Sequence, residues 1–236
     1  MSLTILIPIK NEQDVIEKTI KNIIKSKISK INHEILIVDD FSSDKTKTIL
    51  KKFKKNNKFK LFDNIEPGLG SALRVGIKKS SKEYVCIFMA DESDSISDLV
   101  KYYKIISKYK YDAVFGSRFI NGSKLNDYPF KKLIFNRMFN TLCKIFFFNS
   151  YNDYTNAFKI YKRRVLLSFF PIVSENFNVF LELPLKIVTR KFTYKIIPIS
   201  WTNRTRGESK FIIKELTSKY LFTFFYCLLE KILLKK

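Results

Sequence analysis

Three acidic side chains stand together directly after a run of apolar residues. Residues 84–88 read YVCIF, and the acids lie between Asp91 and Asp94. A buried strand would deliver these carboxylates to the mouth of a cleft, where they repel one another unless a cation neutralises them. Two interpretations fit the pattern. One is a divalent metal site built on these carboxylates, and the other is a solvated loop in which Asp94 or Ser95 caps the next helix.

The chain as a whole is basic, which makes this acidic cluster an exception. Its 236 residues carry a formal net charge of +22. Such a charge indicates an anionic partner, such as a membrane surface, nucleic acid or a phosphorylated substrate, or else a general bias of composition. Hydrophobic residues make up 46% of the chain, which excludes general disorder. The length suffices for one domain with a sizeable core, with or without an appendage.

The rarer residue types argue against several kinds of site. Cys86, Cys143 and Cys227 are widely separated and odd in number. They therefore predict neither a zinc knuckle nor a disulfide framework, and they indicate a reducing compartment. The one histidine, His33, directly precedes a predicted strand, so we expect it on the surface and outside catalysis.

Alternating strands and helices supply the framework that must position the acidic cluster. Strands are predicted at 3–7, 34–38, 59–62, 84–89 and 113–116, and helices at 12–24, 43–54, 68–79 and 97–109. This order predicts an α/β fold with a mostly parallel, doubly wound sheet, which binds ligands at the carboxyl ends of its strands. The polar residues at such ends are Asp39, Asp40, Asp91, Asp94 and the turn 116–118. We therefore expect them in one active site.

Two later segments mix aromatic and basic residues at helical spacing. They cover residues 125–148 and 211–236. Each is interpreted either as a helix packed into the core or as a helix lying in a membrane interface. The apolar run 220–229 has about half of the ~20 residues that a membrane-spanning helix needs, so we expect no transmembrane helix. The start of the chain lacks a basic n-region and a cleavage site, so we expect no signal peptide.

Seven short blocks, in order along the chain, resemble a known family. The blocks ILIPIKNE at 5–12, VDDFSSDKT at 38–46, PGLGSA at 67–72 and GSRF at 116–119 resemble family 2 glycosyltransferases with the GT-A fold. The blocks NDYTNAFKIY at 152–161, FLEL at 180–183 and RTRGESK at 204–210 are similar to dolichyl- or polyprenyl-phosphate mannosyltransferases and their bacterial relatives. The resemblance implies a GT-A domain over 1–215, which includes an interfacial helical segment at 125–148. An amphipathic C-terminal helix over 216–236 would follow it.

The resemblance implies that the donor is a nucleoside-diphosphate hexose, a GDP- or UDP-sugar. The residues implied in binding it are Pro8, Asn11, Glu12, Asp39, Asp40, Gly68, Gly70, Arg204, Ser209 and Lys210. Asp39 can accept a hydrogen bond from a base N–H, and Glu12 can accept one from a ribose hydroxyl. Asn11 and Glu12 could also cap a helix, and Gly68 and Gly70 could form no more than a tight turn.

A divalent cation, Mg²⁺ or Mn²⁺, is implied at Asp91, Ser93 and Asp94. Asp91 matches the second acid of the D-x-D metal motif of the family, but Met89 stands in place of the first acid. This departure leaves three outcomes open: weaker metal binding, a missing ligand supplied by Asp94, or a catalytically dead relative.

Beside Asp91, the resemblance implies catalytic roles for Arg118, Arg204 and Lys210. Positive charges suit a departing diphosphate, because negative charge develops there in the transition state. A solvated basic loop is the other interpretation of the segment that holds Arg204 and Lys210. The acceptor phosphate is implied to bind at Asp153, Thr155, Asn156 and Lys159.

The implied reaction is inverting transfer of the hexose to a polyprenyl phosphate, dolichyl or undecaprenyl. We expect it at the cytoplasmic face of the membrane, with peripheral attachment that is compatible with a membrane-protein partner. This acceptor is already ionised near neutral pH and needs no general base. The alternative is a family 2 enzyme that glycosylates a hydroxyl of a surface glycan, with Asp153 or Glu182 as base. A nucleic-acid-binding module would fit the charge, but no recognised motif for nucleic acid appears, and we expect no such partner.

Overall fold

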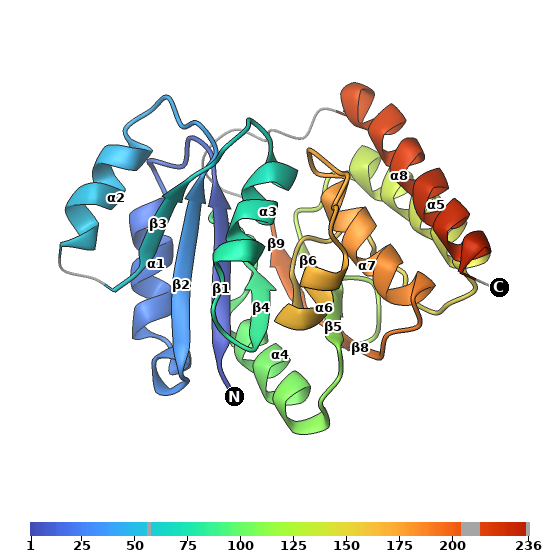
Figure 1. The fold of residues 1–236 in the computed structure, drawn as a ribbon, viewed down its shortest axis with the longest axis horizontal. Coiled ribbons are helices and arrows are strands. Elements are labelled where there is room, and N and C mark those ends of the chain that lie inside the picture. The colour runs from blue at the N-terminus through green and yellow to red at the C-terminus, as the bar shows by residue number, and fades with distance from the viewer. Residues whose placement is uncertain (56–57, 204–212, 235–236) are drawn as a thin grey trace.

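The computed structural model describes residues 1–55, 58–203 and 213–234. Within them, a seven-stranded sheet has the order β3-β2-β1-β4-β7-β5-β8 (Figure 1). The strands are β1 (Leu3–Ile9), β2 (His33–Asp39), β3 (Lys60–Asp63), β4 (Tyr84–Ile87), β5 (Ala113–Ser117), β7 (Lys159–Lys162) and β8 (Tyr194–Pro198). All of them run parallel except β7, which is antiparallel to β4 and β5. The prediction of a mostly parallel α/β sheet is confirmed.

Helices cover both faces of this sheet. One face packs against α1 (Ile16–Lys25), α2 (Thr46–Lys54) and α4 (Ile96–Tyr109), with the short helix η1 (Lys27–Lys30) beside them. The other face packs against α3 (Leu69–Lys79), α5 (Phe130–Phe147), α6 (Arg163–Ser168), α7 (Val179–Thr189) and α8 (Ile213–Leu233). β1 is buried along its whole length because both of its faces lie under helices. This burial explains its nearly continuous run of apolar residues.

β7 was not predicted, and it separates β4 from β5. It pairs with both neighbours, for example Ile160 with Cys86 and with Val114. Four residues with charged ends are too short to show the alternating pattern of a strand. Because β7 runs antiparallel, the segment 152–158 that leads into it lies at the carboxyl edge of β4 and β5. A parallel strand would have placed that segment at the opposite edge.

The segment 125–148 is only partly the helix that its pattern predicts. Its beginning lies in β6 (Lys124–Asn126), which pairs in parallel with β9 (Ser200–Thr202). Pro129 precedes α5 at its N-cap, where a missing N–H costs nothing. α5 then runs along the outside of the molecule beside α8 (Figure 1). In the part of the chain that the structure describes, no helix is both long enough and apolar enough to cross a bilayer.

Candidate active site

Asp39 and Asp40 lie where β2 ends, but they differ in how their carboxylate oxygens are used within the protein. The Asp40 Oδ1 accepts from the Gly68 N–H at 2.8 Å and from the Asn64 side chain at 2.7 Å. The Oδ1 of Asp39 is buried and has no hydrogen-bond partner among the described residues. A buried acceptor without a donor is costly unless a ligand supplies one. Asp40 therefore fixes the neighbouring turn, and the Oδ1 of Asp39 remains available to a donor on a ligand.

The residues that follow β1 join two loops beside Asp39. The Asn11 Oδ1 accepts from the Ser43 N–H at 2.7 Å, and the Asn11 N–H donates to the Ser42 Oγ at 2.9 Å. The backbone N–H of Glu12 donates to the Thr46 hydroxyl at 2.8 Å. Neither residue is the N-cap of α1, which is Val15. These contacts hold the loops after β1 and β2 together at one edge of the sheet.

Pro8 is buried within β1, opposite Val38 of β2. It lacks a backbone N–H, so it can shape the floor of a nucleotide site but cannot donate to it.

Gly68 and Gly70 are required by packing. The Gly70 N–H donates to the carbonyl of Glu175 at 2.7 Å, and the Gly68 N–H is bonded to Asp40. A Cβ at Gly70 would lie 1.9 Å from the carbonyl oxygen of Ser174, and one at Gly68 would lie 2.6 Å from that of Glu175. Their N–H groups are used within the chain, and their missing side chains admit the loop at 174–175. The role of these glycines in donor binding stays a prediction.

Glu182 holds the loop at 174–175 in place through hydrogen bonds to the backbone. It is fully buried on α7 and accepts from the backbone N–H groups of Val173 and Ser174, at 3.1 and 2.8 Å. Lys186 forms an ion pair with it at 3.0 Å. With these partners the carboxylate organises the loop, and it is a poor candidate for a general base.

Gly70→Ala is expected to lower the free energy of unfolding by about 3 kcal/mol, because the new Cβ would meet backbone atoms that cannot move aside. Urea unfolding measures this loss. Gly122→Ala is the matched control, since Gly122 has a positive φ of 86° but only ordinary contacts around its Cβ position. The control is expected to lose only about 1 kcal/mol, from backbone strain. Equal losses in the two variants would show that the loop yields to the added methyl group.

The acidic cluster after β4 divides into carboxylates with different roles. Asp91 is oriented by Ser93, whose backbone N–H and hydroxyl donate to its Oδ1 at 3.1 and 2.6 Å. Glu92 turns away and pairs with Lys18 of α1 at 2.7 Å. Asp94 is buried, and its Oδ2 has no hydrogen-bond partner among the described residues. Burial, together with the charge of Asp91, raises the pKa of Asp94 to about 8.

These features fit a divalent cation. A buried carboxylate oxygen with no donor, close to a second carboxylate, is stabilised when a cation binds between them. Met89, at the position of the missing acid, packs against the hydrophobic core and offers no oxygen. Among the residues that the structure describes, no group of three His, Cys, Asp or Glu side chains is arranged to hold a metal. Asp91 and Asp94 would therefore share the cation with oxygens of a bound diphosphate.

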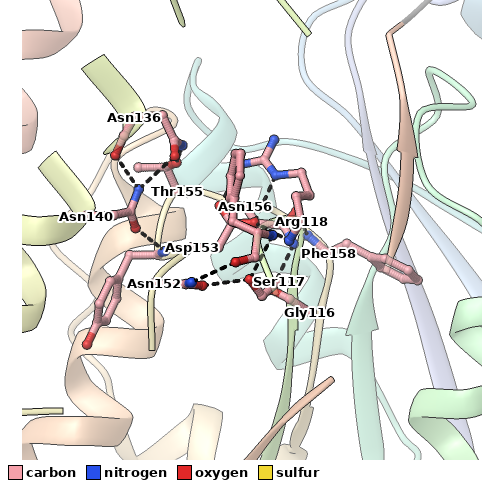
Figure 2. Close-up of polar contacts among 12 residues, drawn as sticks. Gly116, Ser117, Arg118, Asn136, Asn140, Asn152, Asp153, Thr155, Asn156 and Phe158 are labelled. Atoms are coloured by element: carbon pink, nitrogen blue, oxygen red, sulfur yellow. Dashed lines mark hydrogen bonds and ion pairs between the residues drawn. The ribbon is translucent and has the colours of Figure 1, made fainter. Parts of the chain in front are cut away.

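Arg118 and Asp153 form a buried ion pair beside this cluster. The Arg118 Nε and one terminal nitrogen donate to the two carboxylate oxygens at 2.9 and 2.7 Å, and the Arg118 backbone N–H donates as well (Figure 2). The guanidinium also lies 5.2 Å from the ring of Tyr128 and 5.8 Å from that of Trp201. Asp153 accepts three hydrogen bonds, so it positions Arg118 and is a poor proton acceptor.

The loop 152–156 is held by polar residues of α5. Asn136 donates to the Thr155 hydroxyl at 2.7 Å, and Arg137 donates to the carbonyl of Asn152 at 2.8 Å. The side-chain oxygen of Asn140 accepts from the backbone N–H of Tyr154 (Figure 2). The pair Asn136 and Asn140, four residues apart in a helix rich in aromatic and aliphatic residues, was the signal in the sequence that could have revealed this polar side of α5.

Besides Asp153, two residues implied in acceptor binding are buried in the fold. Asn156 donates to the Gly116 carbonyl at 3.2 Å (Figure 2). Lys159 is 1% exposed, and its Nζ donates to the carbonyls of Tyr154 and Asn156. Burial lowers the pKa of Lys159 to about 7. The side chain of Lys159 thus points inward beneath the loop 152–156, and its contact with the acceptor phosphate stays a prediction.

Trp201 is a residue of the site that the sequence reasoning missed. It lies in β9, and its backbone forms an isolated bridge with Asp94. Its ring packs edge-on against Tyr128 at 5.1 Å between centroids. Trp201 lies more than a hundred residues after the acidic cluster, and no local sequence pattern links the two. Only the tertiary structure shows that they are close together. Arg204, Ser209 and Lys210 follow Trp201 in the sequence and lie outside the described residues.

Comparison with known proteins identifies the family of this chain. The model of Glycosyl transferase family 2 matches residues 4–170. Poly-beta-1,6-N-acetyl-D-glucosamine synthase from Staphylococcus aureus strain MSSA476 is 38% identical over 116 residues, which are 49% of this chain and 27% of that protein. The chain thus spans about a quarter of the length of the curated relatives that it matches.

Solved structures share the fold at low sequence identity. Glucosyl-3-phosphoglycerate synthase from Mycobacterium tuberculosis, in complex with UDP, has a TM-score of 0.70 at 13% identity; the match covers 96% of this chain and 80% of the other. S. aureus TarS, in complex with UDP-GlcNAc, has a TM-score of 0.67 at 18% identity; the match covers 98% of this chain and 66% of the other.

The family match covers more than half of the chain, and the carboxylates lie at the carboxyl edge of the sheet. The narrower resemblance to polyprenyl-phosphate mannosyltransferases stays a prediction. The chain belongs to glycosyl transferase family 2, and it has the GT-A fold.

Proposed function

We propose that this enzyme transfers a hexose from a nucleoside-diphosphate sugar to a polyprenyl phosphate, with inversion, at the cytoplasmic surface of a membrane. The observation that carries this proposal is the position of α5. On one side, Asn136, Arg137 and Asn140 of α5 hold the loop 152–156. On its outer side, Phe135 and Met138 are 57% and 64% exposed. One helix thus joins the expected acceptor site to an apolar surface.

α8 extends the apolar surface. The large hydrophobic residues exposed on and beside the two helices are Phe130, Ile134, Phe135, Met138, Ile145, Phe146, Phe148, Leu221, Phe222, Phe225, Leu229, Ile232, Leu233 and Leu234. We call this set the α5–α8 face. Many large exposed apolar side chains on two adjacent helices indicate a site of interaction, and exposed lysines of the same helices, such as Lys144 and Lys219, suit anionic lipid head groups. A lipid acceptor would present its phosphate from that side.

The hydrogen bonds of the two candidate general bases, Asp153 and Glu182, also favour a phosphate acceptor. Asp153 is bonded to Arg118, and Glu182 is bonded to Lys186 and two backbone N–H groups. A hydroxyl nucleophile would need one of them to accept its proton, whereas an ionised phosphate needs no base. Thr155 and Arg118 are the described residues that we propose near the acceptor phosphate.

We further propose that Asp91 and Asp94 hold Mg²⁺ or Mn²⁺ together with the donor diphosphate. A solved structure of glucosyl-3-phosphoglycerate synthase contains Mn²⁺ and UDP-glucose, which supports this assignment. When bound, the cation would stabilise the charge that develops on the leaving diphosphate. The Asp39 side chain would accept from the base of the nucleotide, a GDP- or UDP-sugar, and Asn11 and Glu12 would border the ribose. Arg204, Ser209 and Lys210 are proposed to contact the diphosphate.

A glycan hydroxyl acceptor is the second candidate. Its support is the similarity over 116 residues to a poly-beta-1,6-N-acetyl-D-glucosamine synthase. For that reaction, Asp153 would have to leave Arg118 and become the base.

A transfer assay with the purified protein separates the two candidates. Radiolabelled UDP- and GDP-hexoses are offered with undecaprenyl phosphate, in Mn²⁺ or in EDTA. We expect label in the lipid phase that depends on metal and on one nucleotide sugar. Donor hydrolysis without labelled lipid would contradict the phosphate acceptor and favour the glycan hydroxyl. No consumption of any donor would indicate that the substitution at Met89 has left the enzyme inactive.

Phe225→Gln combined with Leu229→Gln is expected to weaken binding to vesicles of phosphatidylcholine and phosphatidylglycerol about tenfold or more. Both side chains lie on the α5–α8 face and are 60% and 56% exposed. Each would lose roughly 1.5 kcal/mol or more of apolar burial in the bilayer. The control is Ile65→Gln with Tyr109→Gln, which are 78% and 58% exposed elsewhere. Co-sedimentation measures the binding, and equal retention of the two variants would refute a membrane role for this face.

A further inference from the structure

A basic hollow lies at the end of the sheet opposite to the active site. It has a volume of about 460 Å³ and is lined by Lys82, Glu83, Lys110, Lys162, Arg163 and Arg164, with Ser81 beside them. These residues precede β4, follow α4, end the antiparallel strand β7 and begin α6, so they gather at the amino edge of β4 and β5. The carboxylates of the sugar-transfer site lie beyond the carboxyl ends of the same strands. The hollow is therefore a separate place on the molecule.

The fold holds these cations together without a ligand. The Arg163 N–H donates to the Glu83 carbonyl at 2.8 Å, which joins the segment after β7 to the segment before β4. The Arg163 Nε donates to the carbonyl of Ser80 at 2.7 Å. The Lys162 Nζ donates to the carbonyl of Lys110 at 2.6 Å. Backbone carbonyls thus fix two of the basic side chains in position, so binding an anion would require little rearrangement.

Nearby carboxylates balance only part of the positive charge. Asp112 pairs with Lys162 at 2.9 Å, and the partner of Glu83 is the N-terminal amino group at 3.9 Å. Among the described residues, no carboxylate lies within ion-pair distance of Lys82, Lys110 or Arg164. A concave surface lined by charges of one sign concentrates counter-ions. The hollow is thus suited to an anion that carries more than one negative charge.

We propose that this hollow binds a phosphate group, as a second ligand site distinct from the sugar-transfer site. Arginine guanidinium groups match the oxygens of phosphate, and lysines add charge to such a site. A volume of about 460 Å³ falls in the range of small-molecule sites and is too small for a nucleic-acid duplex. The phosphate belongs either to a small soluble molecule or to a lipid head group, and the two sources can be distinguished.

Inorganic pyrophosphate in EDTA is the first probe. Amide shifts in ¹⁵N TROSY spectra of the full chain report each site locally, so binding in the hollow is read from Ser81 and Arg163 and separated from any binding near Asp91. We expect these amides to titrate in the wild type. In Lys110→Gln with Arg164→Gln, the Kd that they report should rise tenfold or more. Both side chains are exposed, so the substitutions leave the core untouched.

Lys51→Gln with Lys54→Gln is the matched control, because it removes two exposed charges from α2. Its Kd should stay within twofold of the wild type. Amides of the hollow that do not respond in the wild type would overturn the proposal. Equal weakening in the two variants would also overturn it, because general positive charge would then explain the binding.

Vesicles of phosphatidylcholine and phosphatidylglycerol are the second probe. A selective loss of vesicle binding in Lys110→Gln with Arg164→Gln would assign the site to a lipid head group. Unchanged vesicle binding with weakened pyrophosphate binding would assign it to a soluble phosphate compound.

Discussion

Asp94→Asn is expected to lower kcat about 10³-fold or more and to leave the protein folded. The Asp94 Oδ2 is buried without a hydrogen-bond partner among the described residues, and Asp91 stands beside it. A divalent cation needs that negative charge, whereas the fold does not, because an amide has the same shape and removes an uncompensated buried carboxylate. Asp91→Asn is expected to have the same effect on kcat. Calorimetric titration with UDP or GDP, with and without Mn²⁺, should show that each variant has lost the metal-dependent part of binding.

Glu92→Gln is the control for this experiment. Glu92 lies between the two aspartates in the sequence, but its carboxylate pairs with Lys18 on α1. The substitution removes one negative charge from the same loop and should change kcat by less than about threefold, because an exposed ion pair contributes little. A fully active Asp94→Asn enzyme would rule out the assignment of Asp94 as a metal ligand. A loss in Glu92→Gln as large as in Asp94→Asn would mean that the loop responds only to its total charge.

Asp153→Asn is expected to lower the free energy of unfolding by about 3–5 kcal/mol. The carboxylate of Asp153 is fully buried and binds the Arg118 guanidinium through both of its oxygens. Asparagine cannot balance that charge, so a buried guanidinium would be left without a counter-ion. Urea unfolding measures the change. The transfer rate should fall as well, since Arg118 would no longer be held beside the acidic cluster.

Two further variants show whether the buried pair itself is responsible. Glu17→Gln breaks the exposed pair with Lys21 on α1 and should cost less than about 0.5 kcal/mol. Arg118→Met combined with Asp153→Leu removes both charges and should recover much of the lost stability, because the desolvation of two ions is removed together with their attraction. The double variant should stay inactive. If Asp153→Asn is as stable as the wild type, then the pair contributes little to folding.

The two experiments separate folding from chemistry at neighbouring positions. Asp94 lies 94 residues into the chain and Asp153 lies 59 residues later, yet both belong to the surroundings of Arg118, whose charge also acts on Asp94. Asp94 has one carboxylate oxygen without a hydrogen-bond partner among the described residues, which is typical of a ligand site. The oxygens of Asp153 are all used, which is typical of a positioning residue. The hydrogen bonds that each carboxylate accepts thus assign different roles to two residues of the same type.

Much of the fold could be predicted from local sequence patterns. The apolar runs of β1, β2 and β4 and the helical spacing of α1, α3 and α4 predicted the parallel sheet, because buried strands and amphipathic helices leave strong periodic signals. The position of Asp39, Asp40, Asp91 and Asp94 at strand ends also followed, since a parallel sheet places those ends along one edge. The order of the blocks was sufficient to indicate the family, which the family match confirmed.

The roles of single residues depended on partners that are distant in the sequence. Gly70 is a glycine because the loop at 174–175 lies against it, more than a hundred residues later. Lys159 is buried because β7 inserts antiparallel between β4 and β5. The sequence by itself determined the α/β framework and the edge on which the carboxylates gather, because those depend on periodicity within short segments. Only the tertiary structure decided which carboxylates are used internally and which remain available to a ligand, because that depends on long-range hydrogen bonds that leave no periodic trace in the chain.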